Sequence, residues 1–286
     1  MKFAVSTTAF RGRPIEDVVC LAGEAGLHLE FSSGLPYRPD MEEIFYEATC
    51  PRIPHNYFPA PRDPFVLNLA SLRSDIRDRS IEHCRKGLRM AARAGAPFYS
   101  AHAGFCIDPA PEDMGRKLPP HEPGPRNEYW SRFVEAVKEL TAEAADLRIQ
   151  FLVENNVLAL FNVLPDGSTP LLCAGHEEIE RLLEEVASAS LGMLLDTGHL
   201  KVSAESLHFS KDTFLTHVAP YVRGIHHSDN DGAEDTNQPV TGKYWFLRHM
   251  PRYAGAYHIL EVHDQTIAQI REQYRLLEKA AEGPNR

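Results

Sequence analysis

The sequence predicts a single (β/α)8 barrel, or TIM barrel, over residues 1–286. Apolar runs of strand length alternate with amphipathic stretches of helical length along the chain, which is typical of parallel strands joined by helices. Eight such runs in 286 residues fit a closed barrel better than an open doubly wound sheet, which more often has fewer strands. The chain contains neither a G-x-G-x-x-G pattern nor a Walker A pattern.

Several of the predicted strands are apolar on both faces, as expected when helices or a barrel interior cover both sides. The predicted strands are residues 2–8, 27–32, 52–58, 97–104, 149–155, 191–197, 222–228 and 256–263. Helical periodicity and end signals predict helices over residues 14–25, 71–94, 129–145, 176–186 and 265–280. Residues 107–125 contain six prolines, so they predict a long loop insert beside the fourth strand, which could cover part of the barrel mouth.

Composition narrows the classes of partner. A hydrophobic content of 43% is enough for a sizeable core, and a formal net charge of −10 makes nucleic acid an unlikely partner. The five cysteines form no C-x-x-C pair and predict neither a disulfide framework nor a zinc ribbon. No run approaches the roughly 18 apolar residues of a membrane span. These features predict a cytoplasmic protein with no membrane partner.

Polar side chains end most of the apolar runs. Because the chemistry of such barrels lies at the carboxyl ends of the strands, these side chains are expected to meet at the barrel mouth. In chain order they are His55, His102, Glu154, Asp196 with His199 just beyond, His226 and Glu261.

Four of these residues predict a metal site. A carboxylate that ends a buried strand is unfavourable unless it is paired, protonated or bound to a cation. Glu154, Asp196, His226 and Glu261 together offer three oxygen donors and one imidazole. This set suits one divalent ion, with Mn²⁺, Mg²⁺ or Co²⁺ favoured and Zn²⁺ less so. Only one of His226 and His227 can face the barrel interior, and the choice depends on register.

The motifs around these residues resemble the xylose-isomerase-like TIM barrel superfamily, which contains sugar isomerases, sugar and sugar-phosphate epimerases, related dehydratases and endonuclease IV. The resemblance covers essentially the whole chain and is carried by LVENN at 152–156, LLDTGH at 194–199, IHHSDNDG at 225–232 and LE at 260–261. It implies that Glu154, Asp196, His226 and Glu261 hold one divalent metal ion. It also implies that His199 contacts the substrate or a second metal.

Other motifs resemble endonuclease IV, of AP endonuclease family 2. They are PHNY at 54–57, LNLAS at 67–71 and AHAGF at 101–105, and they imply that His55 and His102 correspond to metal ligands of the nuclease. The Asp-x-His of the nuclease corresponds here to Asp235-Thr236-Asn237. An amide is a much weaker zinc ligand than an imidazole, so the full three-zinc site of the nuclease is not expected.

The leading hypothesis from the sequence is a divalent-metal-dependent sugar or sugar-phosphate isomerase or epimerase. Glu154 and Glu261 would transfer the proton through a metal-stabilised enediolate. The substrate contacts would come from His199, His102, His55, Asp235 and Asn237. The alternatives are a metal-dependent dehydratase or lyase on a polyhydroxy carbonyl compound, an endonuclease IV-like AP endonuclease, and a non-catalytic barrel that binds a carbohydrate or a partner. Assembly into a homo-oligomer stays open.

Overall fold

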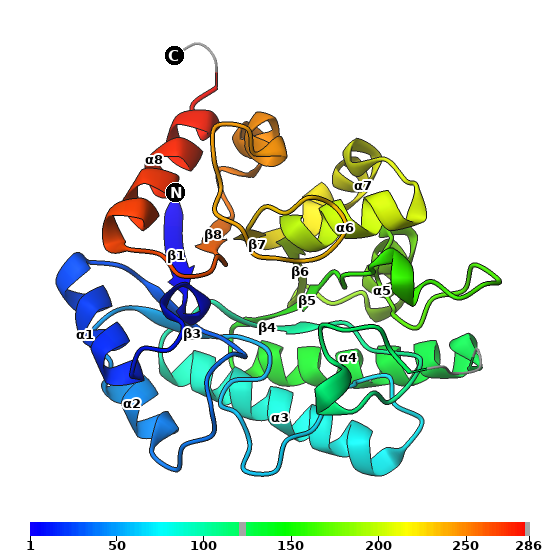
Figure 1. Cartoon of the computed structure of the whole chain (residues 1–286). Coiled ribbons are helices and arrows are strands. Elements are labelled where there is room, and N and C mark those ends of the chain that lie inside the picture. Colours follow the sequence, from blue (N-terminus) through cyan, green and yellow to red (C-terminus); the bar gives the residue numbers. More distant parts are fainter. Residues whose placement is uncertain (120–123, 284–286) are drawn as a thin grey trace.

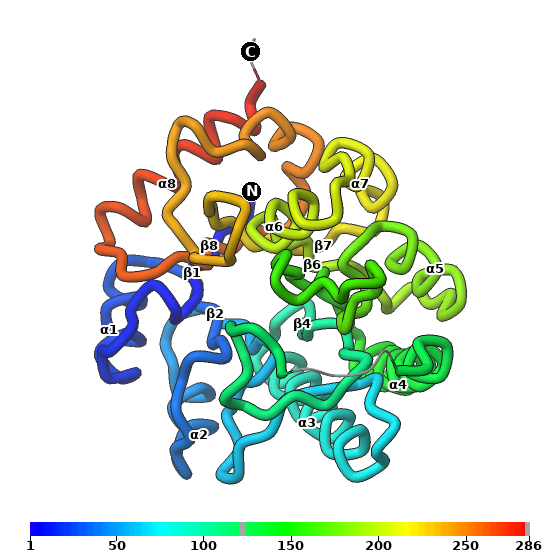
Figure 2. The backbone as a smooth tube through the Cα atoms, turned by 45° about the vertical axis from the view of Figure 1, so that its right-hand side comes forward, coloured from blue at the N-terminus to red at the C-terminus, as the bar shows by residue number. Residues whose placement is uncertain are grey.

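The computed structural model describes residues 1–119 and 124–283 and contains eight parallel strands surrounded by helices (Figures 1 and 2). The strands are β1 Lys2–Ser6, β2 Leu29–Phe31, β3 Arg52–Pro54, β4 Phe98–His102, β5 Gln150–Glu154, β6 Leu191–Asp196, β7 Val222–His227 and β8 Tyr257–Leu260. Their order is β3-β2-β1-β8-β7-β6-β5-β4. An isolated parallel bridge between His55 and Ser100 joins the two end strands. The prediction of a single (β/α)8 barrel is therefore confirmed.

The helices form a ring outside the strands (Figure 2). They are α1 Ile15–Ala25, α2 Met41–Glu47, α3 Ser74–Arg93, α4 Arg126–Asp146, α5 His176–Val186, α6 Thr197–Leu207, α7 Lys211–Val218 and α8 Ile267–Ala281. The five predicted helices are confirmed with small shifts at their ends. Helices α2, α6 and α7 were not predicted from the sequence. Helix α6 lacks a clear polar stripe because most of its residues are buried, so its helical period is weak.

All eight strands are shorter than predicted, and two of them show why. The run 52–58 stops being a strand after Pro54, because the backbone turns at Asn56 with a φ of 47°. The run 2–8 ends at Ser6, where the 3-10 helix η1 Thr7–Phe10 begins. Because β3 ends at Pro54, His55 is the first residue of the connection that follows the strand, at the carboxyl end of the barrel.

The proline-rich segment is a loop in its described part, with only the short 3-10 helix η2 Pro111–Asp113. Residues 120–123 lie outside the described residues. The loop is tied to the connection that follows β5, since Leu118 N donates to Asn162 Oδ1 at 2.9 Å and Cys106 N donates to Pro170 O at 2.7 Å. The two connections are therefore joined over the β4–β5 side of the barrel.

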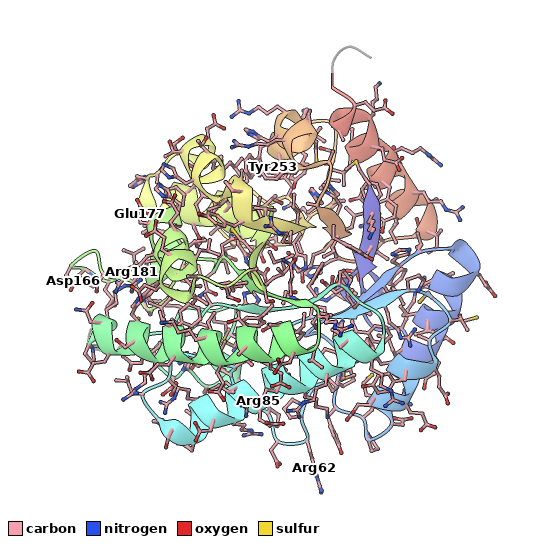
Figure 3. The ribbon with its side chains drawn as sticks, turned by 180° about the vertical axis from the view of Figure 1, so that it is seen from behind. Arg62, Arg85, Asp166, Glu177, Arg181 and Tyr253 are labelled. Carbon is pink, nitrogen blue, oxygen red and sulfur yellow. The ribbon has the colours of Figure 1, made fainter. Side chains whose placement is uncertain are left out.

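Ion pairs connect two neighbouring helices of the outer layer, α3 and α4. Figure 3 shows α3 and α4 side by side with Arg85 at their junction. Arg85 pairs with Glu139 and, at 3.2 Å, with Glu143, while Arg89 Nε lies 2.8 Å from Glu143. Within the described part of the chain, no helix is long and apolar enough to cross a membrane.

Candidate metal centre

The ends of four neighbouring strands bring Glu154, Asp196, His226 and Glu261 together. One potential ligand atom from each residue lies within 4.8 Å of the others. The Nδ1 atom of His226 is 2.9 Å from Glu261 Oε2, 3.3 Å from Glu154 Oε1 and 3.5 Å from Asp196 Oδ2. These carboxylates thus converge on one nitrogen of one imidazole.

The converging atoms are buried but lack ordinary partners. Within residues 1–119 and 124–283, no well-aligned hydrogen bond reaches either oxygen of Glu154, Oδ2 of Asp196 or Nδ1 of His226. All three side chains are fully buried. Buried polar atoms without partners are destabilising, and several carboxylate oxygens facing one another repel. The donor set of three carboxylates and one imidazole therefore fits a divalent cation.

The two oxygens of Asp196 have different roles. Asp196 ends β6 and is the N-cap residue of α6, and its Oδ1 accepts a hydrogen bond from His199 N at 2.7 Å. This bond satisfies one free amide of the first helical turn and leaves Oδ2 to face the cluster. Asn155, the residue directly after β5, holds the Asp196 backbone, since its Oδ1 accepts from Asp196 N at 2.8 Å and its Nδ2 donates to Asp196 O at 3.0 Å. The position of Asp196 is thus fixed by both neighbouring elements.

His199 lies at the start of α6 beside the cluster. Its Nδ1 donates to Asn155 O at 2.9 Å, so its Nε2 is left to face Asp235 Oδ2 at 3.4 Å. Gly198 makes this approach possible, because a Cβ there would lie 2.4 Å from Ser228 Oγ and 3.0 Å from Asp235 Oδ1. The loop after β7 can therefore pack directly on the first turn of α6.

His55 and His102 lie on the other side of Glu154. Their Nε2 atoms are 3.3 Å and 3.6 Å from Glu154 Oε2, and the three residues form a second group that could hold a metal ion. Ser100 Oγ lies 2.9 Å from His55 Nδ1, which fixes the orientation of the His55 ring. The two oxygens of Glu154 thus face two different groups of ligands.

Charge and burial shift the acid-base equilibria of the cluster. Burial raises the pKa of Glu154 to about 7, although His226 opposes the rise. Burial also raises the pKa of Glu261, again against His226. For Asp196, burial alone would raise the pKa, but His199 and His226 outweigh it and the pKa is lowered. Burial alone would lower the pKa of His226, yet Glu30, Glu261 and Glu154 raise it well above its usual value.

The amide of Asn237 is oriented by a chain of contacts along the rim. Arg11 Nη1 lies 3.1 Å from His263 Nδ1, and because a guanidinium can only donate, the proton of the neutral imidazole sits on Nε2. The Asn237 amide, whose Nδ2 is placed 3.2 Å from that Nε2, must then turn its oxygen toward His263. The oxygen of Asn237 is thereby used by His263, which leaves an NH₂ donor in place of a metal ligand.

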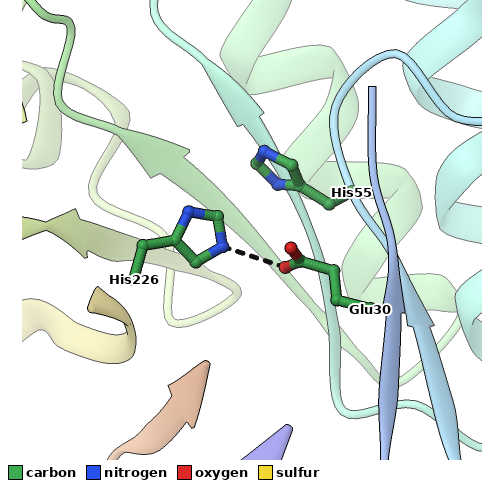
Figure 4. Close-up of side chains that lie close together, drawn as sticks. All are labelled: Glu30, His55 and His226. Carbon is green, nitrogen blue, oxygen red and sulfur yellow. Dashed lines mark hydrogen bonds and ion pairs between the residues drawn. The ribbon is translucent and has the colours of Figure 1, made fainter. Parts of the chain in front are cut away.

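Sequence reasoning missed Glu30, which lies inside the barrel on β2. Its side chain is fully buried, and its Oε2 is 2.9 Å from His226 Nε2 (Figure 4). The signal was an acid within the apolar run Leu29-Glu30-Phe31, where a charged residue facing inward needs a partner. The structure brings the predicted ligands together, and it places Asp235 beside His199.

Comparison with known proteins identifies the family of this barrel. The profile of the xylose isomerase-like TIM barrel, AP endonuclease family 2, matches residues 38–280. The chain belongs to this family. No curated protein matches the sequence significantly.

Solved structures show the same fold at low sequence identity. A D-tagatose 3-epimerase-like protein aligns with a TM-score of 0.72 and 16% identity over 99% of this chain and 97% of its own. A Thermus thermophilus protein soaked with zinc chloride aligns with a TM-score of 0.68 and 20% identity over 100% of both chains. An AP endonuclease of family 2 from Brucella melitensis aligns with a TM-score of 0.65 and 14% identity over 94% of this chain and 95% of its own.

Proposed function

We propose that the protein is a divalent-metal-dependent isomerase or epimerase that acts on a sugar or sugar phosphate. The observation that carries the proposal is the cluster of Glu154, Asp196, His226 and Glu261, whose buried ligand atoms face one another without hydrogen-bond partners. Similar solved structures support the substrate class, because several of them are described as sugar epimerases or as epimerase-like.

The chemistry needs one group to remove a proton beside a carbonyl and another to return it. A divalent cation bound by the four residues would polarise the substrate carbonyl. Glu154 ends β5 and Glu261 directly follows β8, and both side chains reach the cluster. One carboxylate would accept the proton from the substrate carbon, and the other would donate a proton on the opposite face. Each carboxylate has two oxygens, so one can bind the cation while the other exchanges the proton.

Three histidines lie around Glu154 and would bind the substrate hydroxyls. His199 keeps Nε2 free of backbone contacts, and His102 and His55 face Glu154 from the β3–β4 side. Asp235 and the NH₂ group of Asn237 add an acceptor and a donor at the β7 edge. These five residues would position a polyhydroxy compound over the cation.

The test measures metal content and substrate hydrogen exchange together. The purified protein should carry about one Mn, Co, Mg or Zn per chain by elemental mass spectrometry. Screening ketoses and their phosphates in deuterated water should reveal a substrate that incorporates carbon-bound deuterium. Glu154→Gln and Glu261→Gln should each slow this incorporation by about 10²–10⁴-fold, the range for loss of a general acid or base. Glu180→Gln, a surface change on α5, is the matched control and should behave as the wild type.

Near-normal turnover in both barrel variants would refute the proposed roles of Glu154 and Glu261. Loss of water from the substrate without isomerisation would instead identify a dehydratase or lyase that uses the same first proton transfer.

A second candidate is a metal-dependent phosphodiester hydrolase like the AP endonucleases. The observation that favours it is the second group of His55, His102 and Glu154. Two metal ions per chain and cleavage of abasic DNA would support it. The donor at Asn237 and the net charge of −10 both count against it, because a duplex must be held by cationic side chains.

A further inference from the structure

Glu30 is a carboxylate in an unusual place, within a three-residue strand that is buried at every position. Its Oε1 has no hydrogen-bond partner among the described residues, and its one ion pair there is with His226. A buried carboxylate is unfavourable without compensation, so a partner that specifically needs it is expected. Figure 4 shows the Glu30 carboxylate directed at the His226 ring.

The hydrogen bond fixes which nitrogen of His226 carries the proton. An ionised carboxylate only accepts, so Nε2 of His226 must donate to Glu30 Oε2 at 2.9 Å. In the neutral ring, which is the form in which a histidine binds a metal ion, the lone pair then lies on Nδ1. That atom faces Glu261, Glu154 and Asp196 at 2.9, 3.3 and 3.5 Å. The two nitrogens of one ring thus face two different sets of carboxylates.

We propose that Glu30 is the positioning residue that prepares His226 as a metal ligand. It holds the Nε2 proton, and it keeps the Nδ1 lone pair and the plane of the ring directed at the three carboxylates. Ligating histidines are commonly held by a carboxylate through their second nitrogen. The inference rests on the proposed function, in which a divalent ion is bound at Glu154, Asp196, His226 and Glu261.

The close approach of His55 offers a competing role for Glu30. Glu30, His55 and His226 also have potential ligand atoms within 4.8 Å of one another. However, His226 Nε2 cannot donate to Glu30 and bind an ion at the same time. The geometry therefore favours a hydrogen-bonding role for Glu30 over a ligand role.

The experiment compares three variants for binding of Co²⁺ and Zn²⁺ to the metal-free full-length protein, by competition with a chromogenic chelator. Glu30→Leu removes the acceptor, and its affinity should fall by about 10–100-fold, as for other residues that hold a metal ligand in place. Glu30→Gln keeps an acceptor oxygen and should retain most of the affinity. Ser100→Ala is the matched control, because it removes a 2.9 Å contact to His55, which is not among the four ligands. Its first-ion affinity should equal that of the wild type.

Far-UV circular dichroism and the melting temperature of each metal-free variant separate folding from binding. If Glu30→Leu does not fold, Glu30→Gln and a spectroscopic measurement still decide the matter. Long-range ¹H–¹⁵N correlation of the zinc-loaded wild type should show His226 with its proton on Nε2 and zinc on Nδ1. The opposite tautomer would overturn the proposal.

The remaining outcomes separate this inference from the proposed function. A wild type that binds no divalent ion contradicts the proposed function itself. A wild type that binds one ion, with unchanged affinity in Glu30→Leu, contradicts only the role of Glu30. Equal losses in Glu30→Gln and Glu30→Leu, or a loss in Ser100→Ala as large as in Glu30→Leu, also overturn it. A lower number of bound ions in Glu30→Leu with unchanged first-ion affinity makes Glu30 a ligand and overturns the positioning role.

Discussion

Two regions of the molecule combine histidine and carboxylate, and they differ in how these groups are satisfied. In the barrel, Glu154, Asp196 and His226 are fully buried. On the outside, His176 and Glu180 of α5 meet His217 of α7. Both regions place their ligand atoms within 4.8 Å of one another. Residue type and proximity therefore do not distinguish them.

Partners and ring orientation do distinguish them. Each oxygen of Glu180 contacts a histidine, at 3.3 Å for His176 and 2.8 Å for His217. The two rings are stacked with centroids 4.2 Å apart and 6° between their planes, so their nitrogen lone pairs lie in separate, parallel planes. At this surface site, both carboxylate oxygens of Glu180 therefore already have a histidine as hydrogen-bond partner. The barrel atoms lack such partners, and that difference is what indicates a cation site.

The largest effect that would test this comparison is stabilisation by metal. A divalent ion at about 100 times its dissociation constant should stabilise the protein by about 2.7 kcal/mol, a rise of roughly 5–10 °C in the melting temperature. Asp196→Asn should abolish the rise, because an amide is a weak ligand, while its side chain can still cap α6. Glu180→Gln should keep the full rise. Thermal melts with and without Mn²⁺ or Zn²⁺ measure it. A rise that depends on Glu180 rather than Asp196 would reverse the comparison.

The barrel cluster was predictable because its ligands end apolar runs, and the carboxyl ends of parallel strands meet in every such barrel. Glu30 was missed because β2 is only three residues long and its acid lies in the middle of the strand rather than at its end. The surface cluster, formed by His176, Glu180 and His217, was missed because His217 comes from α7, a short helix that was not predicted from the sequence. Long-range pairing between elements leaves no periodic signal in the sequence.

His83 sharpens the comparison, because it is a buried histidine without a carboxylate partner. It stacks on Tyr57 with centroids 5.3 Å apart, and its Nε2 has no hydrogen-bond partner among the described residues. Burial lowers the pKa of His83 from 6.5 to about 4. The unfolded chain therefore binds a proton more readily than the folded one between these values. Burial of His83 in its neutral form therefore leaves the free energy of unfolding undiminished above pH 6.5. As the pH falls toward 4, the unfolded chain gains the proton first and the free energy of unfolding decreases.

The His83 effect should be intermediate in size. With a pKa of 6.5 in the unfolded chain and about 4 in the folded one, at 1.36 kcal/mol per pKa unit, the loss of stability between pH 7 and pH 5 is at most about 2 kcal/mol. His83→Gln does not titrate, so its stability should fall less steeply with acid than that of the wild type. Urea unfolding at pH 7, 6 and 5 measures the two slopes. Parallel slopes would mean that burial of this histidine does not penalise its charged form.

The smallest expected effect is the coupling energy between Glu180 and His217 at the surface cluster. It tests whether these residues form only solvent-exposed contacts and no metal site. The side chains of Glu180 and His217 are 32% and 43% exposed, so water and salt screen their interaction. A double-mutant cycle of Glu180→Gln and His217→Gln should give a coupling of roughly 0–1 kcal/mol in unfolding free energy, and it should shrink further in high salt. A coupling of several kcal/mol, or one that grows when zinc is added, would mean that the stacked rings rearrange around an ion. In that event, proximity of ligands alone would mark a metal site in this fold, and the unsatisfied buried atoms of the barrel would lose their diagnostic value.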